Sequence, residues 1–199
     1  QAIHHISHDA KGDLLLSLLG SDKDTALVFT RTKHRADRLG RMLGSAGHRV
    51  AVLHGDRSLS QRRAALDGFK RGTFRVLVAT DIAARGIDVA NIGHVINFDL
   101  PNCPEDYVHR IGRTARMKTT GRATSFVTRE DHQQLQDIER LLGHAVPLAP
   151  GSSAPVPVSH VRAGGVRRND QTSSGPSRSG AGRRRPHYGS AQPARSVHH

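Results

Sequence analysis

The stretch that decides the fold is Phe74-Arg-Val-Leu-Val-Ala79, followed directly by Thr80 and Asp81. Such a nearly continuous apolar run is typical of a parallel strand that helices cover on both faces. The hydroxyl and the carboxylate mark the carboxyl end of that strand, which is where open α/β sheets bind their ligands. The stretch therefore predicts both the type of sheet and the edge at which a functional site lies.

Similar apolar runs recur along the chain, and segments with helical periodicity separate them. Strands are expected at residues 3–6, 25–30, 49–53, 74–79, 94–98 and 123–127. Helices are expected at residues 9–19, 33–45, 59–70 and 130–142, with another that begins at Pro104. This alternation predicts an α/β fold with a doubly wound, mostly parallel sheet and right-handed crossovers.

Local signals mark several helix ends. Gly47 follows the helix expected at 33–45 and is suited to stop it. Ser58 and Gln61 form a capping-box pattern, in which two side chains satisfy amide donors at a helix start. Pro104 and the two acidic residues after it suit a first helical turn.

The chain has 199 residues and a formal net charge of +13, from 30 Lys and Arg against 17 Asp and Glu. This excess favours a polyanionic partner, most often nucleic acid, although ribosome-binding and membrane-surface proteins share it. No apolar run approaches the ~18 residues of a membrane span, and no signal-peptide pattern precedes the first strand. We therefore expect no membrane partner.

Cys103 is the only cysteine, which excludes an internal disulfide and a cysteine-based zinc site. The 14 His residues are scattered without a carboxylate or thiolate set at ligand spacing, so we expect no metal site. The expected compartment is the reducing cytoplasm. Because the chain begins at Gln1 rather than Met, we also expect it to be part of a longer protein.

The composition changes near Pro147, which divides the chain into a folded domain, residues 1–147, and a basic tail, residues 148–199. The tail holds eight Arg and one Asp, a net charge of +7, and is otherwise rich in Gly, Ser and Pro. It can bury too little apolar surface to offset its ordering entropy, so we expect it to be disordered. Its arginines can hold nucleic-acid phosphates without sequence preference. A plain solubilising tail is the alternative.

A second polar stretch, His109-Arg110-Ile-Gly-Arg113-Thr-Ala-Arg116, spaces its arginines three residues apart. One helical turn would aim the guanidiniums at roughly one side. Arginine stays charged and its planar fork fits phosphate oxygens, so a bound anion would relieve the repulsion among them. A solvated basic helix face is the alternative. We favour an anion site because another phosphate-suited segment precedes the stretch.

That preceding segment is Thr80-Asp81-Ile-Ala-Ala-Arg85-Gly86-Ile-Asp88. Gly86 permits close approach of the backbone to a ligand, and the hydroxyl of Thr80 suits a phosphate oxygen. Asp88 can accept a hydrogen bond from a ribose hydroxyl. The alternatives are that Asp81 caps a helix and that Asp88 forms a turn.

A third segment, His54-Gly55-Asp56, ends another strand in the same way, although a glycine turn explains it nearly as well. Taken together, the segments resemble the second, C-terminal RecA-like domain of DEAD-box ATP-dependent RNA helicases, within helicase superfamily two. The resemblance runs from about residue 3 to residue 142 and implies a RecA-like fold. Its motifs lie in the family's order: residues 27–33 resemble motif IV, 54–69 the segment after it, 78–89 motif V and 109–116 motif VI.

The resemblance implies catalytic roles for the arginine stretch. Arg113 and Arg116 would be the arginine fingers that reach the γ-phosphate of ATP. His109 and Arg110 would link to the acidic motif of a partner domain. The family usually has glycine where this chain has Ala115, and a methyl group there could crowd Arg116, so Arg113 is the safer assignment.

The resemblance also implies nucleotide and RNA contacts. Asp88 would hold the ribose, with Gly86 beside it. The RNA backbone would be contacted by Thr30, Arg31, Gly55, Arg62, Thr80, Asp81, Arg85 and Gly86. The family usually has Gln where this chain has Leu59, although the arginine of the same signature, Arg62, is retained.

The implied function is ATP hydrolysis coupled to local unwinding of RNA. The chain has neither a Gly-x-x-x-x-Gly-Lys-Thr phosphate loop nor an Asp-Glu-Ala-Asp run. We therefore expect an N-terminal RecA-like domain of the same full-length protein to hold most of the ATP and Mg²⁺, and the chain alone to hydrolyse ATP negligibly. Two alternatives remain: a nonspecific RNA-binding module without catalysis, and a superfamily-two DNA translocase domain.

Overall fold

The computed structural model describes residues 1–85, 89, 92–114, 121–150 and 152. The predicted site residues Gly86, Asp88 and Arg116 lie outside the described residues. So does the predicted disordered tail, except for its first few residues.

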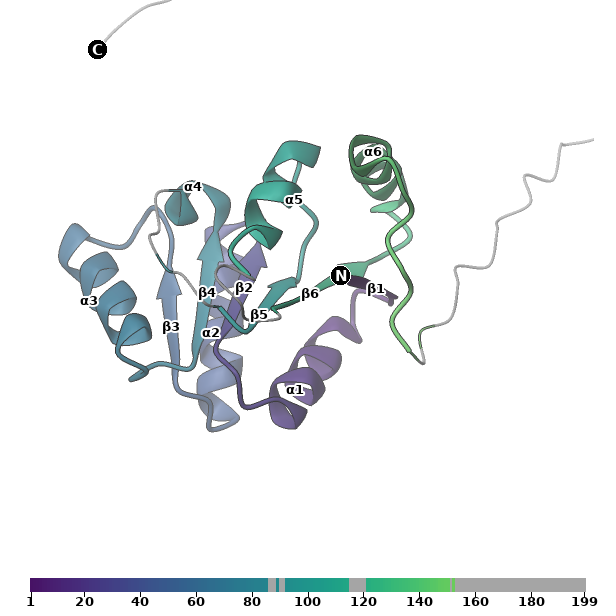
Figure 1. Ribbon diagram of the computed structural model, residues 1–199. Coiled ribbons are helices and arrows are strands. Elements are labelled where there is room, and N and C mark those ends of the chain that lie inside the picture. The colour runs from purple at the N-terminus through teal and green to yellow at the C-terminus, as the bar shows by residue number, and fades with distance from the viewer. Residues whose placement is uncertain (86–88, 90–91, 115–120, 151, 153–199) are drawn as a thin grey trace, which may run out of the picture. The chain divides into compact units, whose positions relative to one another are not determined.

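Helices and strands alternate along the described chain (Figure 1). The elements are β1 (Ala2–His5), α1 (Lys11–Ser21), β2 (Ala26–Thr30), α2 (Lys33–Ser45), β3 (Val50–Leu53), α3 (Leu59–Lys70), β4 (Val76–Thr80), α4 (Asp81–Ala84), β5 (His94–Asn97), α5 (Pro104–Ile111), β6 (Arg122–Val127) and α6 (His132–Leu142). The strands form one sheet in the order β1-β6-β5-β2-β4-β3, and every pairing between them is parallel. The predicted doubly wound α/β fold is confirmed.

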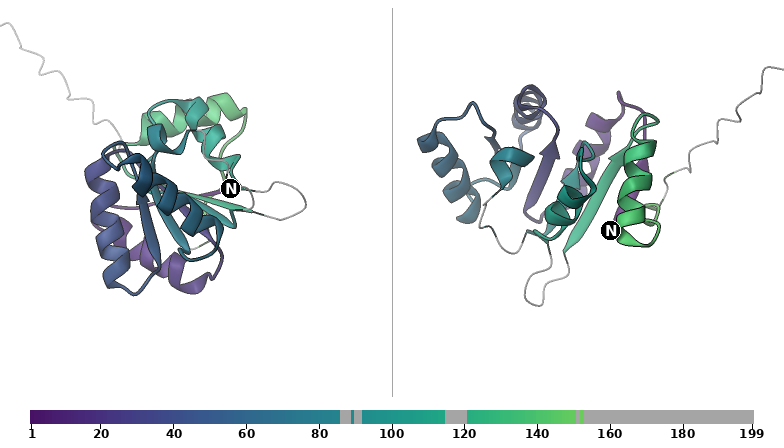
Figure 2. Two further views of the ribbon diagram at one scale, coloured as in Figure 1. Left: turned by 90° about the vertical axis from the view of Figure 1, so that its left-hand side faces the viewer. Right: turned by 90° about the horizontal axis from the view of Figure 1, so that it is seen from above.

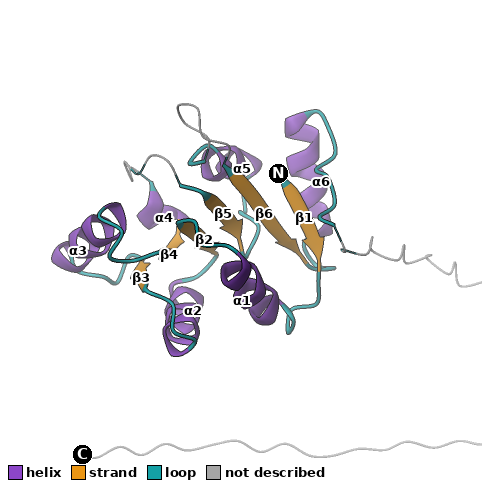
Figure 3. Cartoon of the chain, turned by 60° about the horizontal axis from the view of Figure 1, so that its bottom comes forward, coloured by secondary structure: helices purple, strands orange, loops and turns teal. Residues whose placement is uncertain are grey.

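Helices cover both faces of the sheet because successive strand residues point to opposite sides. Val28 of β2 packs with α1 and α2, whereas Leu27 and Phe29 pack with α3 and α4. A third apolar cluster joins α5 and α6 to the ends of β1 and β6. Figure 3 shows α1 and α2 on one side of the sheet and α3 to α6 on the other. Among the described helices, none has the length and apolar character that crossing a membrane requires.

The predicted helix ends are confirmed where the signal is local. Gly47, with φ of 83°, donates its N–H to the carbonyl of Gly44 just after α2. Ser58 and Gln61 form the reciprocal capping box of α3. Pro104 stands in the first turn of α5, followed by two acidic residues. The short helix α4 was not predicted, because its sequence reads equally as a turn.

Residues just beyond the predicted domain boundary at Pro147 contact β1. Ile3 of β1 donates to the carbonyl of Pro147 at 2.8 Å and accepts from the N–H of Ala149 at 2.8 Å. The N–H of His5 donates to the hydroxyl of Ser152 at 3.0 Å. Residues 147–150 and 152 therefore lie along the outer edge of β1, which the sequence did not reveal because Gly, Ser and Pro dominate there.

The approach of α2 to β3 depends on Gly40. A Cβ atom at this buried position would overlap Cγ2 of Val52. We expect Gly40→Ala to lower the free energy of unfolding by about 1–3 kcal/mol, because overpacking forces the helix away from the strand. Equilibrium unfolding in urea measures this change.

Gly44 provides the matched control on the same helix. A Cβ atom there would lie 3.8 Å from Val50 Cγ1, an ordinary contact. Gly44→Ala should leave stability unchanged or raise it by up to about 1 kcal/mol through helix propensity. Equal effects of the two substitutions would contradict the packing argument.

A buried histidine stands at the amino end of β5. His94, which is 2% exposed, hydrogen-bonds Thr124 Oγ1 through Nε2 at 2.8 Å and approaches Asp22 Oδ2 through Nδ1 at 3.3 Å. Arg122 also pairs with Asp22. Burial and then the Arg122 guanidinium lower the pKa of His94, and the Asp22 carboxylate opposes them without outweighing them.

Stability should therefore depend on pH through His94. A depressed pKa in the folded state means that the unfolded chain binds the proton more readily, so the free energy of unfolding falls as pH drops below the ordinary histidine value of about 6.5. His94→Gln should reduce the slope of the unfolding free energy against pH, measured by urea unfolding between about pH 5 and pH 8. His4, His5 and His48, whose pKa values burial also lowers, should keep part of it.

The exposed His144 is the control. His144→Gln should leave the slope as it is. An identical reduction in both variants would show that the burial of His94 is not the cause.

Candidate active-site pocket

A pocket of about 240 Å³ opens between α4 and α5, above the carboxyl end of β2. Its lining residues are Phe29, Asp81, Ala84, Arg85, Asp106, His109, Arg110 and Arg113. β2 lies in the middle of the sheet. The chain continues from it into α2, which packs on the face of the sheet opposite to α4 and α5. The pocket thus lies at the edge where a doubly wound sheet is expected to bind ligands, as predicted.

Arg110 forms the floor of this pocket together with Asp81. Its Nε and Nη2 donate to the two carboxylate oxygens of Asp81 at 2.6 and 2.7 Å. Its Nη1 donates to Asn97 Oδ1 at 3.0 Å and to the carbonyl of Asp99 at 2.7 Å. The guanidinium also lies over the ring of Phe29, 4.7 Å from its centroid, an arrangement that favours a cation.

Arg110 is only 2% exposed, and its guanidinium donates to groups inside this domain. Its predicted link to a partner domain stays a prediction. The alternative that the sequence offered for Asp81 is wrong. Asp81 is not a helix cap, because Thr80 occupies the N-cap position and the Asp81 carboxylate binds Arg110. The ion pair instead fixes the start of α4 against α5.

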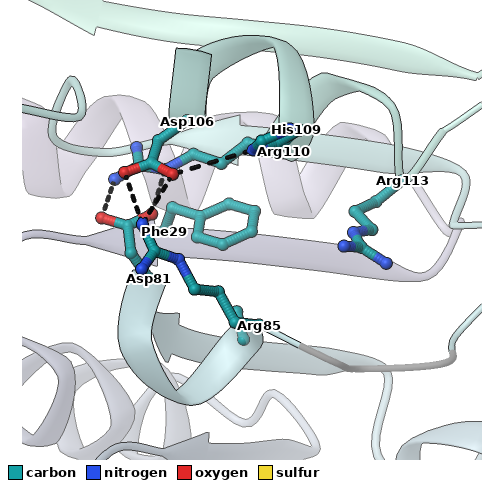
Figure 4. Close-up of a pocket in the computed structure, with 8 residues that line it drawn as sticks. Phe29, Asp81, Arg85, Asp106, His109, Arg110 and Arg113 are labelled. Atoms are coloured by element: carbon teal, nitrogen blue, oxygen red, sulfur yellow. Dashed lines mark hydrogen bonds and ion pairs between the residues drawn. The ribbon is translucent and has the colours of Figure 1, made fainter. Parts of the chain in front are cut away.

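Arg110 and Arg113, the two motif arginines among the described residues, do not share one helix face, contrary to the prediction. α5 ends at Ile111 with Gly112 as its C-cap, so Arg113 follows the helix rather than continuing it. Arg113 lines the pocket at the end away from the Asp81–Arg110 pair (Figure 4). His109 is exposed and lies 3.8 Å from Asp106. Arg110 and Arg113 therefore both line the pocket, but with different surroundings.

A second ion pair joins α4 to α5 at the surface of the pocket. Arg85 Nη2 donates to both carboxylate oxygens of Asp106, at 3.0 and 3.2 Å (Figure 4). The hydrogen bond to Asp106, and then its charge, raise the pKa of Arg85. Sequence reasoning placed Asp106 only in the first turn of a helix. Phe29, Ala84 and Asp106 were not singled out for the pocket, because no local pattern reports which side chains face it.

The residues expected to contact RNA separate into two groups. Gly55 and Arg85 are exposed, Arg62 is partly buried, and Thr80 is nearly buried at the end of β4. All four follow or end the neighbouring strands β3 and β4, so they stand at the same edge of the sheet as the pocket.

Thr30, Arg31 and Asp81 have other surroundings. Thr30 is 0% exposed and its hydroxyl donates to the carbonyl of Thr32 at 3.3 Å. Arg31 reaches α6, donating to Asp131 at 3.3 Å and Gln134 at 3.2 Å. Thr30 is buried, and Arg31 and the Asp81 carboxylate pair with other side chains of the domain, so their predicted RNA contacts stay predictions.

A buried charge cluster that the sequence did not reveal lies beside Arg31. Lys11 Nζ donates to the carbonyl of Phe98 at 2.8 Å and lies 3.6 Å from Asp99 and 3.7 Å from Asp131. Burial lowers the pKa of Lys11, although both carboxylates oppose the shift. The cluster ties α1, the end of β5 and the start of α6 together. Its members are far apart in sequence, so no spacing could have indicated it.

Comparison with known proteins places these features in a family. A model of the helicase conserved C-terminal domain matches residues 10–118, more than half of the chain. The ATP-dependent RNA helicase vasa of Drosophila melanogaster is 44% identical over 151 residues, 74% of this chain and 23% of vasa. The ATP-dependent RNA helicase RhlB of Escherichia coli is 38% identical over 192 residues, 93% of this chain and 44% of RhlB.

The fold agrees with that of solved relatives. The E. coli DEAD-box protein SrmB, solved bound to regulator of ribonuclease activity A, superposes with a TM-score of 0.71 at 34% identity, covering 78% of this chain and 95% of that one. The chain spans less than half the length of vasa and of RhlB. By its family match, its motifs and its parallel sheet, the chain belongs to the helicase conserved C-terminal domain family, as the RecA-like C-terminal domain of the DEAD-box RNA helicase group.

Proposed function

We propose that this chain is the second RecA-like domain of an ATP-dependent RNA helicase, supplying arginine fingers for ATP hydrolysis and part of an RNA backbone track. The observation that carries the proposal is the position of Arg113 in a basic pocket at the carboxyl edge of the sheet. The printed names of vasa and RhlB, both ATP-dependent RNA helicases, support the same function. Arg116 is included on the resemblance of its motif alone.

The pocket chemistry suits the terminal phosphates of ATP. Basic side chains outnumber carboxylates in its lining, and guanidinium groups fit phosphate oxygens. Among the described residues, no group of three or more His, Cys, Asp or Glu stands ready to hold a metal ion. We therefore assign Mg²⁺ mainly to the N-terminal RecA-like domain of the full-length protein. Bound ATP would supply the phosphoryl group that passes to water.

The residues of this chain act by position and charge. The Asp81–Arg110 pair locks α4 against α5 and so fixes the base from which Arg113 extends. Arg113 would stabilise the negative charge that develops on the transferring phosphoryl group. Fixed placement matters, because an error of about 1 Å in a catalytic group can lower a rate roughly a hundredfold.

The RNA track would run along Gly55, Arg62, Thr80 and Arg85. Contacts to phosphates and sugars position a strand without reading its bases. The 2′-hydroxyls are the groups through which such a track separates RNA from DNA.

The deciding experiment measures ATP turnover by the full-length protein without nucleic acid, with single-stranded RNA and with DNA of the same sequence. We expect RNA to stimulate turnover at least about tenfold more than DNA, and this chain alone to show negligible turnover with either. Equal stimulation by DNA would favour the translocase alternative. Steady turnover by the isolated chain, abolished by Arg113→Ala, would overturn the division of labour proposed here.

A further inference from the structure

A single carboxylate ties the turn after β3 to helix α2. Asp37 Oδ1 lies 3.0 Å from His54 Nε2 and 2.5 Å from Arg57 Nη2. α2 and α3 lie on opposite faces of the sheet (Figure 2, right), and the turn between β3 and α3 passes over the strand end between them. Asp37 therefore reaches from one face of the sheet to the loop that begins α3 on the other.

His54 connects Asp37 to the backbone of the turn through hydrogen bonds. The ring is 3% exposed, and its Nδ1 accepts the N–H of Asp56 at 3.3 Å. With Nε2 facing Asp37, both ring nitrogens are engaged. Lys33, in the first turn of α2, also pairs with the Asp56 carboxylate at 2.7 Å. The turn is thus held at two points by the same helix, with Gly55 between them.

The charge of Asp37 is well maintained. Burial opposes ionisation, but the hydrogen bonds from His54 and Arg57, together with the Arg57 charge, outweigh it and lower the pKa of Asp37. The residue remains a carboxylate at neutral pH and can hold two donors together.

Two arginine side chains, Arg57 and Arg62, stand beside the turn at the start of α3. Among the described residues, the buried side-chain nitrogen and oxygen atoms without a hydrogen-bond partner are Arg57 Nε and Arg62 Nε. A buried donor without an acceptor is unfavourable, and native structures keep few of them. Both atoms belong to arginines at the start of α3, beside the turn that Asp37 holds.

We propose that Asp37 is a positioning residue for RNA binding, which holds the turn 54–58 so that Gly55 and Arg62 face the sugar-phosphate backbone and Arg57 adds a further cationic contact. The proposal rests on the proposed function, since that function supplies the RNA. Asp37 itself would not touch RNA, because its carboxylate would repel phosphate and is already engaged by His54 and Arg57.

The test uses Asp37→Asn in the full-length helicase, which keeps the shape of the side chain and removes its charge. We expect the RNA concentration for half-maximal ATPase to rise about tenfold, with kcat at saturating RNA within about twofold of the unsubstituted protein. A merely structural role would lower the melting temperature and the active fraction, and so kcat, but would leave the RNA concentration dependence unchanged.

Two further variants keep the test decisive. Arg57→Gln preserves the Asp37–His54 contact and should raise the same RNA concentration by a smaller factor, about threefold, even if Asp37→Asn folds poorly. Asp137→Asn, on the outer face of α6, removes a carboxylate that binds Gln133 and Arg140 and should change neither the RNA dependence nor kcat.

The outcomes are distinguishable. A full-length protein with no RNA-stimulated ATPase would overturn the proposed function and this inference with it. RNA-stimulated activity whose RNA dependence is the same in the unsubstituted protein, Asp37→Asn and Arg57→Gln would overturn the inference alone.

Discussion

Arg113→Ala in the full-length helicase is expected to lower RNA-stimulated kcat for ATP by about 10³-fold or more, while RNA affinity changes less than about threefold. Arginine fingers in GTPases contribute 10³–10⁵ in rate, equivalent to about 4–7 kcal/mol of transition-state stabilisation. The same kind of contribution is expected here because Arg113 lines the pocket at the carboxyl edge of the sheet. Steady-state ATPase at saturating RNA measures the loss.

The comparison variants separate charge from geometry. Arg113→Lys keeps a positive charge but loses the planar fork, so it should recover only a small part of the rate. Arg140→Ala, on the exposed face of α6, removes an arginine paired with Asp137 and should leave turnover unchanged. Full activity in Arg113→Ala would show that Arg113 does not take part in catalysis.

Asp81→Ala is expected to lower the free energy of unfolding by about 3 kcal/mol. The loss is large because Arg110, which is almost fully buried, would keep its charge without a counter-ion. This loss of unfolding free energy should lie at the low end of the range for buried ion pairs that lose one partner, because the pocket lets water reach the position of the removed carboxylate. Urea unfolding of the chain measures the change.

A double substitution tests the cause. Arg110→Met removes the stranded charge while filling similar space, so Asp81→Ala combined with Arg110→Met should be less destabilised than Asp81→Ala by about 1 kcal/mol or more. Additive losses in the double variant would show that the two side chains contribute to stability independently.

The sequence predicts the fold well because its signals are local and repeated. Apolar runs of strand length, a capping box at Ser58 and a stop at Gly47 each report on residues within a few positions. Their alternation leaves few arrangements besides a parallel sheet with helices on both faces. The carboxyl-edge position of the site follows from the same argument.

The direction of individual side chains could not be predicted in this way. Arg110 turns inward because Asp81, 29 positions earlier, meets it across the pocket. Lys11 is buried because Asp99 and Asp131 surround its ammonium group, and neither is near it in sequence. The spacing of charged residues along a helix does not indicate which distant residues they will contact. The spacing of the motif therefore predicted that its three arginines point to the same side, without distinguishing the buried Arg110 from the others.

The segment that runs along β1 has a consequence for handling the protein. Strands at the border of a sheet invite pairing with other molecules, which leads to aggregation. Here the amide and carbonyl of Ile3 are already satisfied by Pro147 and Ala149. A version of the chain that ends before Pro147 would leave both groups of Ile3 unpaired and is expected to self-associate, whereas one that ends after Ser152 keeps both hydrogen bonds.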